Sequence, residues 1–166
     1  AREPRVLHDL TRFISLIVTC CVTVLLAQLV SDYLWGTEII PILLLGMTIT
    51  IAYGQEMALL VTASVILVIS VAIGLEFEQS LVLLATAAGA ILVLKQVRTR
   101  GKLISVGAVA AGVALFTTVG VGTLHSQPHL QLWVQGLQLA LWSVIAGLLM
   151  LGILPAVERV FNVQTD

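Results

Sequence analysis

Charged side chains are scarce in this sequence, and aromatic side chains are scarcer still. Of its 166 residues 10% are charged and 5% are aromatic, whereas soluble domains carry roughly 25% charged residues. So little charge excludes an ordinary water-soluble globule, and it excludes a disordered chain, which combines high charge with few apolar residues. Eight basic residues against nine acidic ones leave no positive field for phosphates, so nucleic acid is excluded as a partner.

Residues that carry chemistry are also few. Two adjacent cysteines, Cys20 and Cys21, lie in an apolar run and cannot form a disulfide framework. His125 and His129 are four residues apart, but Pro128 lies between them, so we interpret both as loop residues rather than metal ligands. The sequence contains no Ser/His/Asp set, no glycine loop for phosphate and no paired carboxylates inside an apolar run. We therefore predict no catalytic residue, no cofactor, no metal site and no enzymatic activity for this chain.

Apolar residues are abundant, at 59% of the chain, and the mean hydropathy is +1.10. They form six segments, and a helix needs roughly 20 apolar residues to cross a bilayer core. Backbone groups in lipid must bond within their own segment, so we predict an all-α fold, a polytopic bundle of six membrane helices. The predicted spans are residues 13–34, 39–53, 57–74, 80–94, 103–124 and 132–154. The second span is short and could instead re-enter the membrane without crossing it.

The distribution of charge predicts the orientation of the bundle. With six crossings, every basic residue falls on one side of the membrane: Arg2, Arg5, Arg12, Lys95, Arg98, Arg100, Lys102 and Arg159. The loops on the other side carry the acidic residues Asp32, Glu38, Glu76 and Glu78. By the positive-inside rule, both termini are predicted to be cytoplasmic, in a cell inner membrane.

Small residues at helical spacing predict which spans pack closely. Gly107 and Ala111 lie four residues apart in the fifth span, and Ser143 and Gly147 do so in the sixth. Because lipid is as apolar as leucine, membrane helices associate through close packing of small residues. Spans four to six are therefore predicted to form a tight group.

Two polar sets are candidate binding sites. Gln135, Gln138 and Ser143 form a possible intramembrane polar face, which could line a ligand pocket or, more simply, bond to a neighbouring helix. Lys95, Arg98, Arg100 and Lys102 form a compact basic loop. That loop could attract the headgroups of anionic membrane lipids, or serve as a docking surface for a cytoplasmic domain.

The last twelve residues carry a motif, with Pro155, Glu158, Phe161, Thr165 and Asp166 in a P-x2-E-x2-F-x3-T-D pattern. This stretch resembles the junction between membrane and enzyme in the bacterial seven-transmembrane HD phosphohydrolases. Ile40-Pro41 followed by Gly46-Met47, the stretch 55–59 and the basic loop 97–100 are similar to the same family. The resemblance extends over nearly the whole chain.

The resemblance implies a role in signalling. Members of that family carry an extracellular sensor domain and a cytoplasmic HD domain that binds two metal ions and hydrolyses cyclic di-AMP. On this interpretation residues 1–12 are a cytoplasmic basic lead-in and residues 13–154 are the transmembrane domain. Residues 155–166 are then a linker toward an HD domain that this chain does not contain, and Pro155 is expected to break or kink the helix there.

The resemblance makes a membrane-embedded sensor module our first hypothesis, with its parent's HD and sensor domains as partners. Two alternatives remain open. One is a structural or accessory integral-membrane subunit of a larger complex. The other is a small permease, although the sequence has no charged residues at the middle of its spans and no internal repeat.

Overall fold

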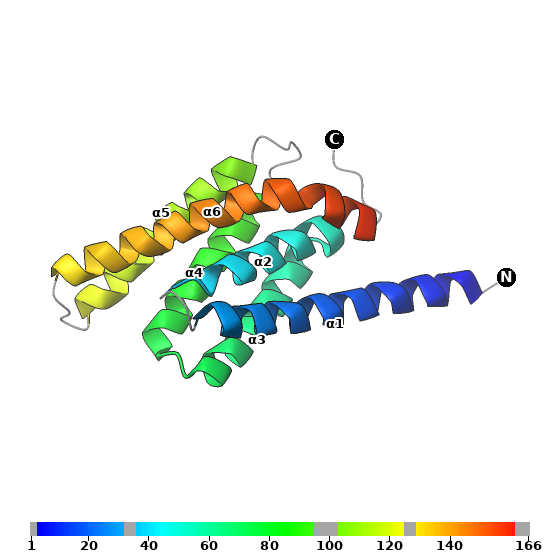
Figure 1. The fold of residues 1–166 in the computed structure, drawn as a ribbon, viewed down its shortest axis with the longest axis horizontal. Coiled ribbons are helices and arrows are strands. Elements are labelled where there is room, and N and C mark those ends of the chain that lie inside the picture. The colour runs from blue at the N-terminus through cyan, green and yellow to red at the C-terminus, as the bar shows by residue number, and fades with distance from the viewer. Residues whose placement is uncertain (1–2, 32–35, 95–102, 125–128, 162–166) are drawn as a thin grey trace.

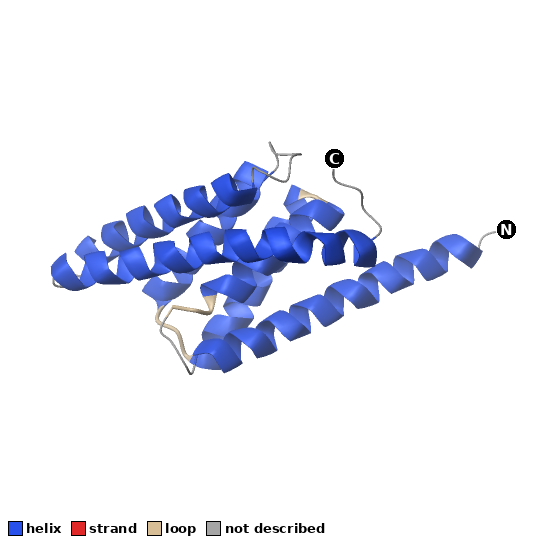
Figure 2. Ribbon diagram, turned by 45° about the horizontal axis from the view of Figure 1, so that its top comes forward, coloured by secondary structure: helices blue, strands red, loops and turns tan. Residues whose placement is uncertain are grey.

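The computed structural model describes residues 3–31, 36–94, 103–124 and 129–161, and every regular element in these ranges is an α-helix (Figure 2). The helices are α1 (Glu3–Ser31), α2 (Ile39–Tyr53), α3 (Gln55–Ile73), α4 (Phe77–Leu94), α5 (Leu103–Leu124) and α6 (His129–Phe161). Within the described ranges, all of these except α2 are long and apolar enough to cross a membrane. The predicted all-α polytopic bundle is confirmed, and each predicted span coincides with a helix.

Two helices are longer than predicted. α1 begins at Glu3, so most of the predicted lead-in 1–12 continues the first helix. α6 runs through Pro155 to Phe161, so of the two outcomes expected at this proline, a break or a kink, the helix is not broken. Proline removes one backbone hydrogen bond and crowds the preceding turn, which kinks a helix without necessarily ending it. Figure 1 shows the last turns of α6 turning away from the line of the earlier ones.

The helices run between two ends of an elongated bundle (Figure 1). α1 starts and α6 finishes at one end, which we call the terminal end. The ends of α1, α3 and α5 and the starts of α2, α4 and α6 lie toward the opposite, distal end. An even number of crossings brings the start of α1 and the end of α6 to the same end of the bundle. Which side of the membrane each end faces remains a prediction from the charges.

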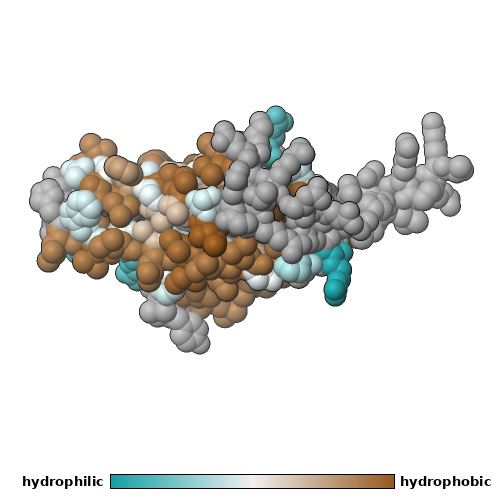
Figure 3. Space-filling model, turned by 90° about the horizontal axis from the view of Figure 1, so that it is seen from above, coloured by the Kyte–Doolittle hydropathy of each residue, from teal (hydrophilic) through white to brown (hydrophobic). Residues whose placement is uncertain are grey.

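The outer surface of the bundle is apolar. Brown, hydrophobic side chains cover much of the surface coloured in Figure 3. Large apolar residues such as Leu67 (66% exposed) and Phe116 (80% exposed) face outward. Exposed apolar surface on this scale would be unstable in water and is typical of a lipid-facing surface. The chain is accordingly a multi-pass membrane protein.

The short helix α2 lies at the centre of the bundle. It contacts α1, α3, α4 and α6, and Ile42, Leu43 and Met47 are each at most 1% exposed. Its 15 residues span only about 22 Å at 1.5 Å per residue. A helix enclosed by protein need not match the bilayer, because its ends are shielded from lipid. Gly54, with φ of 100°, joins α2 directly to α3 and adopts a backbone conformation that favours glycine.

Helices α5 and α6 approach each other at the level of the backbone. A Cβ atom on Gly147 would lie 2.9 Å from the Cα of Gly107 and 3.3 Å from the Leu103 carbonyl oxygen. Ser143 and Gly136 lie on the same side of α6 and are buried. The two helices also share the most extensive contact in the bundle. The small residues of spans five and six therefore meet as predicted, since neither helix has side chains that hold the backbones apart.

Hydroxyl groups within the helices mostly bond to their own backbone. Thr86 donates to the Val82 carbonyl at 2.7 Å, and Thr118 donates to the Ala114 carbonyl at 2.7 Å. Such bonds satisfy a hydroxyl where no water is present. One bond instead joins two helices: the Ser80 hydroxyl of α4 lies 2.8 Å from the Ser70 oxygen of α3.

Replacing Ser80 with alanine is expected to lower the free energy of unfolding by about 0.6 kcal/mol, the typical value of a hydrogen bond between membrane helices. The matched control is Ser64→Ala, because Ser64 is exposed and bonds to Leu60 of its own helix. Unfolding midpoints in mild detergent would measure both variants. Equal midpoints for the two would show that the Ser80–Ser70 bond does not hold α3 to α4.

Candidate functional site: a polar cavity at the distal end

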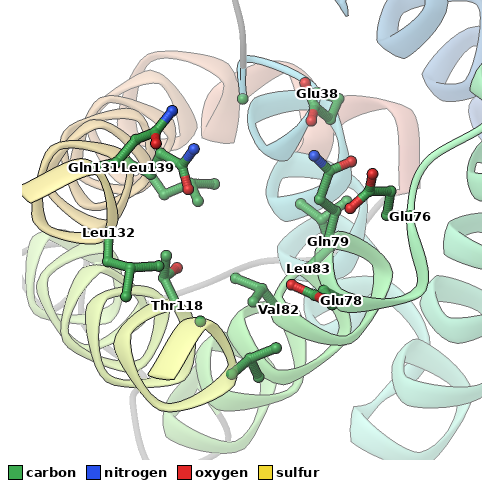
Figure 4. A pocket seen from close by; sticks show the side chains of 14 residues that line it. Glu38, Glu76, Glu78, Gln79, Val82, Leu83, Thr118, Gln131, Leu132 and Leu139 are labelled. Atoms are coloured by element: carbon green, nitrogen blue, oxygen red, sulfur yellow. The ribbon is translucent and has the colours of Figure 1, made fainter. Parts of the chain in front are cut away.

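A cavity of about 280 Å³ opens at the distal end of the bundle. Its wall is formed by the turn before α2, the start of α4, the last turns of α5 and the first turns of α6 (Figure 4). Residues as far apart in sequence as Glu38 and Gln135 line it together. Its volume is near the lower limit of ordinary small-molecule sites.

Polar groups lie on opposite walls of the cavity. Glu38, Glu76 and Gln79 are neighbours on the α2 and α4 side, and Gln131 lies across the opening on α6 (Figure 4). Glu78 and Gln135 also contribute to the lining. The cavity therefore combines three carboxyl groups with three carboxamides, which can both donate and accept hydrogen bonds.

The rest of the lining is apolar. Val82 and Leu83 of α4 and Leu132 and Leu139 of α6 are buried residues that face the cavity (Figure 4). A site of this composition accommodates the apolar part of a ligand while a few polar groups set its orientation.

Glu38 is the most deeply buried carboxylate of the cavity, at 8% exposure. It precedes α2 but makes no side-chain capping bond to that helix. Burial raises the pKa of the Glu38 carboxyl, although the backbone N–H groups of Glu38 and Gly36 act in the opposite direction. A carboxylate in this position is costly to ionise unless a positive charge or further donors face it.

Trp142 lies just behind the cavity wall. Its Cδ1 atom is 3.9 Å from the place where a Cβ on Gly36 would stand, and Gly36 lines the cavity. Its indole nitrogen is buried and has no hydrogen-bond partner in the part of the chain that the structure describes. Buried polar groups are normally satisfied, so an unused donor lies beside the site.

The predicted polar face on α6 is divided. Gln135 lines the cavity. Gln138 is half-buried and is not among the lining residues given for the cavity. Ser143 is fully buried and donates to the Leu139 carbonyl at 2.8 Å, close to the contact between α5 and α6. The three residues thus do not form one site. Gln135 belongs to the cavity, and Ser143 lies close to the contact between α5 and α6.

Two other predicted sets lie largely outside the described residues. The basic loop with Lys95, Arg98, Arg100 and Lys102 falls in the gap 95–102, and Thr165 and Asp166 fall beyond residue 161. Pro155 is exposed within α6, and the backbone at Glu158 and Phe161 is helical. The linker therefore begins as a continuation of the last membrane helix.

Sequence reasoning did not identify Glu38 as a site residue. It counted Glu38, Glu76 and Glu78 as charges of outer loops, because in the sequence each borders an apolar run. One signal was available: Glu38 directly precedes the short span 39–53, and a short span places its flanking charge closer to the bilayer.

The raised pKa of Glu38 predicts a pH-dependent stability. The folded state binds the proton more tightly than the unfolded chain, so the stabilisation is present below the ordinary value of 4.5 and is lost as pH rises through the raised value. Glu38→Gln should abolish this loss and be more stable than the native protein at neutral pH. Melting midpoints across this range would test it, with the exposed Glu56→Gln as control. A native slope retained in Glu38→Gln would contradict the assignment of this loss to the Glu38 carboxyl.

Comparison with known proteins places the bundle in a family. The family model described as a 7TM receptor with intracellular HD hydrolase matches residues 2–165. No curated protein and no solved structure matches the chain. The matched range includes every described helix in full, and it extends through the stretch that begins at Pro155. The chain belongs to the family of 7TM receptors with an intracellular HD hydrolase, of which it is the membrane-embedded receptor part.

Proposed function

We propose that this bundle senses a signal at its distal end and regulates a cytoplasmic HD hydrolase that cleaves cyclic di-AMP. In this proposal both termini lie in the cytoplasm of a bacterial cell, and the bundle lies in the inner membrane. The charge distribution supports the orientation, since all basic residues lie within residues 2–12, within residues 95–102 or at position 159. The family supports the link to a hydrolase, and the resemblance of the 155–166 stretch suggests the substrate.

The observation that carries the proposal is the continuity of α6. This helix lines the cavity with Gln131 and Gln135 and runs without interruption to Phe161 at the terminal end. Its 33 residues extend over about 50 Å, which exceeds the thickness of a bilayer core. In this proposal a displacement at the cavity is transmitted along one continuous helix, through its bend at Pro155, to the linker.

The packing indicates how the displacement could arise. α5 and α6 are held together through Gly107 and Gly147, so they form one wall of the cavity as a unit. α2 and α4 supply the opposite wall (Figure 4). A ligand shifts a conformational equilibrium only by its difference in affinity for the two states. A ligand that contacts both walls has different affinities for two states in which the separation of the walls differs.

Pro155 is the position at which this transmission can be tested. In the full-length protein with its HD domain, Pro155→Ala restores the missing backbone bond and straightens the end of α6. We expect the basal rate of cyclic di-AMP hydrolysis in nanodiscs to change at least about threefold, equivalent to about 0.6 kcal/mol. Glu158→Ala combined with Phe161→Ala should alter the same rate.

Gly152→Ala is the matched control, because Gly152 is an exposed residue of α6 with no heavy atom within 4 Å of an added Cβ. It should leave the rate at the native value. Native rates in the Pro155 variant and the double variant alike would contradict regulation through α6. They would instead favour a bundle that only anchors the enzyme, as a structural subunit does.

A further inference from the structure

An apolar groove of about 720 Å³ runs between α1 and α3 on the outer surface of the bundle. On α3 it is lined by residues spaced three and four apart, namely Met57, Leu60, Val61, Ser64, Val65 and Val68. This spacing is one face of a helix. The stripe extends over about three turns of α3, or about 16 Å. The groove is therefore elongated along the helix axis and fits an elongated partner.

The chemistry of the groove excludes a polar partner. None of its lining residues is charged, and the one hydroxyl, that of Ser64, already donates to the Leu60 carbonyl at 2.8 Å. The α1 wall is a second stripe, formed by Cys20, Cys21, Val24 and Leu25. Because an ion or a polar molecule would lose its hydration here without replacement, the partner is apolar along its contact.

The floor of the groove is continuous with the core of the bundle. Val65 is 7% exposed and belongs to that core, and Val24 and Val61 pack against it. The rims are open, since Leu25 is 59% exposed and Leu60 is 68% exposed. A helix laid along the groove would cover both rims and extend the existing contact between α1 and α3, with its ridges in the groove.

Helix α1 has less protein around it than the other long helices. It contacts α2 and α3 and lies at the outside of the bundle (Figure 1). Only 11% of the residues in Phe13–Val30 are buried, against 28–39% in the other long spans that the structure describes. Membrane helices are held together by packing contacts with other helices. α1 is thus the helix with the most surface left for a further one.

The family indicates that a further helix exists. Its receptor part is described as having seven transmembrane helices, and the described ranges of this chain contain six. The longest gap between those ranges is eight residues, whereas a membrane span needs roughly 20. On that count, one transmembrane helix of the receptor has to be supplied from outside these residues.

We propose that the groove between α1 and α3 seats this seventh transmembrane helix, an apolar helix of the same polypeptide that packs against Leu25 and Leu60. The docking goes beyond the signalling role proposed above and does not depend on it. In the complete receptor, α1 is then enclosed on two sides, and a displacement of the seventh helix acts on α1 and α3 together.

Photocrosslinking in the full-length receptor in nanodiscs tests the proposal. p-Benzoylphenylalanine replaces Leu25 in one variant and Leu60 in another, and mass spectrometry after proteolysis identifies the crosslinked segment. We expect both positions to crosslink to one apolar helix outside residues 1–166, within a single polypeptide and independently of protein concentration. The matched control is Leu141, which is 59% exposed on α6 and should crosslink to lipid alone.

Truncation of the same side chains gives a second measurement. In the full-length receptor, Leu60→Ala should lower the unfolding midpoint by at least about 4 °C, because the helix that covers it leaves a cavity behind. Leu141→Ala should unfold near the native midpoint, since acyl chains fill the space.

Crosslinks from Leu25 and Leu60 to lipid alone would overturn the proposal and assign the groove to an acyl chain. Crosslinks to residues 1–166 of a second copy would overturn it in favour of a dimer interface. Crosslinks from the two positions to different helices, or to none, would also refute it. Equal midpoints for Leu60→Ala and Leu141→Ala would contradict a protein neighbour at Leu60.

Discussion

Gly147→Val is expected to lower the free energy of unfolding by about 3 kcal/mol or more, because it forces apart two backbones that touch. The added Cβ would stand 2.9 Å from the Gly107 Cα and 3.3 Å from its nitrogen, where favourable carbon contacts require about 3.5–4.0 Å. The atoms in the way belong to the backbone of α5 and cannot rotate aside. Overpacking of a tight core commonly costs about 1–3 kcal/mol, and a contact with backbone exceeds that range.

Gly152→Val provides the matched control on the same helix. It introduces the same side chain and the same change in helix propensity, but nothing lies within 4 Å of the added Cβ. Thermal unfolding followed by fluorescence-detected size exclusion in detergent would compare the two. On α5, Gly107→Val and Gly112→Val form the reciprocal pair, since Gly112 is also free of neighbours. Comparable midpoints within each pair would mean that α5 and α6 do not meet through these glycines.

Leu43→Ala is expected to lower the free energy of unfolding by about 2–5 kcal/mol. Leu43 is 1% exposed in the central helix α2, so its removal leaves a cavity that neighbouring helices enclose. Lipid or detergent chains cannot fill such a cavity. The lost contacts therefore remain lost, which is the main source of the penalty inside a membrane protein.

Leu67→Ala removes the same atoms from α3, where Leu67 is 66% exposed. Acyl chains replace the missing side chain there, so the free energy of unfolding should fall by less than about 0.5 kcal/mol. Denaturation of both variants in the same detergent would measure the difference. If the two truncations cost the same, α2 is not the core of the bundle.

The helices could be predicted from sequence because the bilayer imposes strong local requirements. Apolar length determines each span, and the breaks at Gly54, Gly74 and the charged loops separate them. Close packing of spans five and six through small residues was also predictable, since association in lipid needs small residues at helical spacing. Both properties are contained within one or two neighbouring turns of the chain.

The central position of α2 could not be predicted in the same way. Hydropathy records that α2 and α3 are apolar, but it does not distinguish a protein neighbour from a lipid neighbour. The cavity was missed for a related reason, because Glu38 and Gln135 are brought together only by the packing of four helices. The sequence did identify Gln135 as a candidate, while Ser143 was grouped with it only as a further polar residue in the same apolar run.

The shortness of α2 has an electrical consequence. α2 is about 8 Å shorter than a bilayer core of about 30 Å. Gly54 alone joins α2 to α3 at the terminal end of the bundle. We therefore expect the missing length to lie at the other end of α2, next to Glu38. Figure 1 shows α5 and α6 projecting past that point. With the terminal end of α2 at one face of the bilayer core, a charge at Glu38 is expected to lie roughly a quarter of the way into the membrane field, which is worth about 2.3 kcal/mol per charge per 100 mV over its full depth. The free energy of ionising the Glu38 carboxyl is then expected to vary with the voltage across the membrane, by about 0.6 kcal/mol per 100 mV.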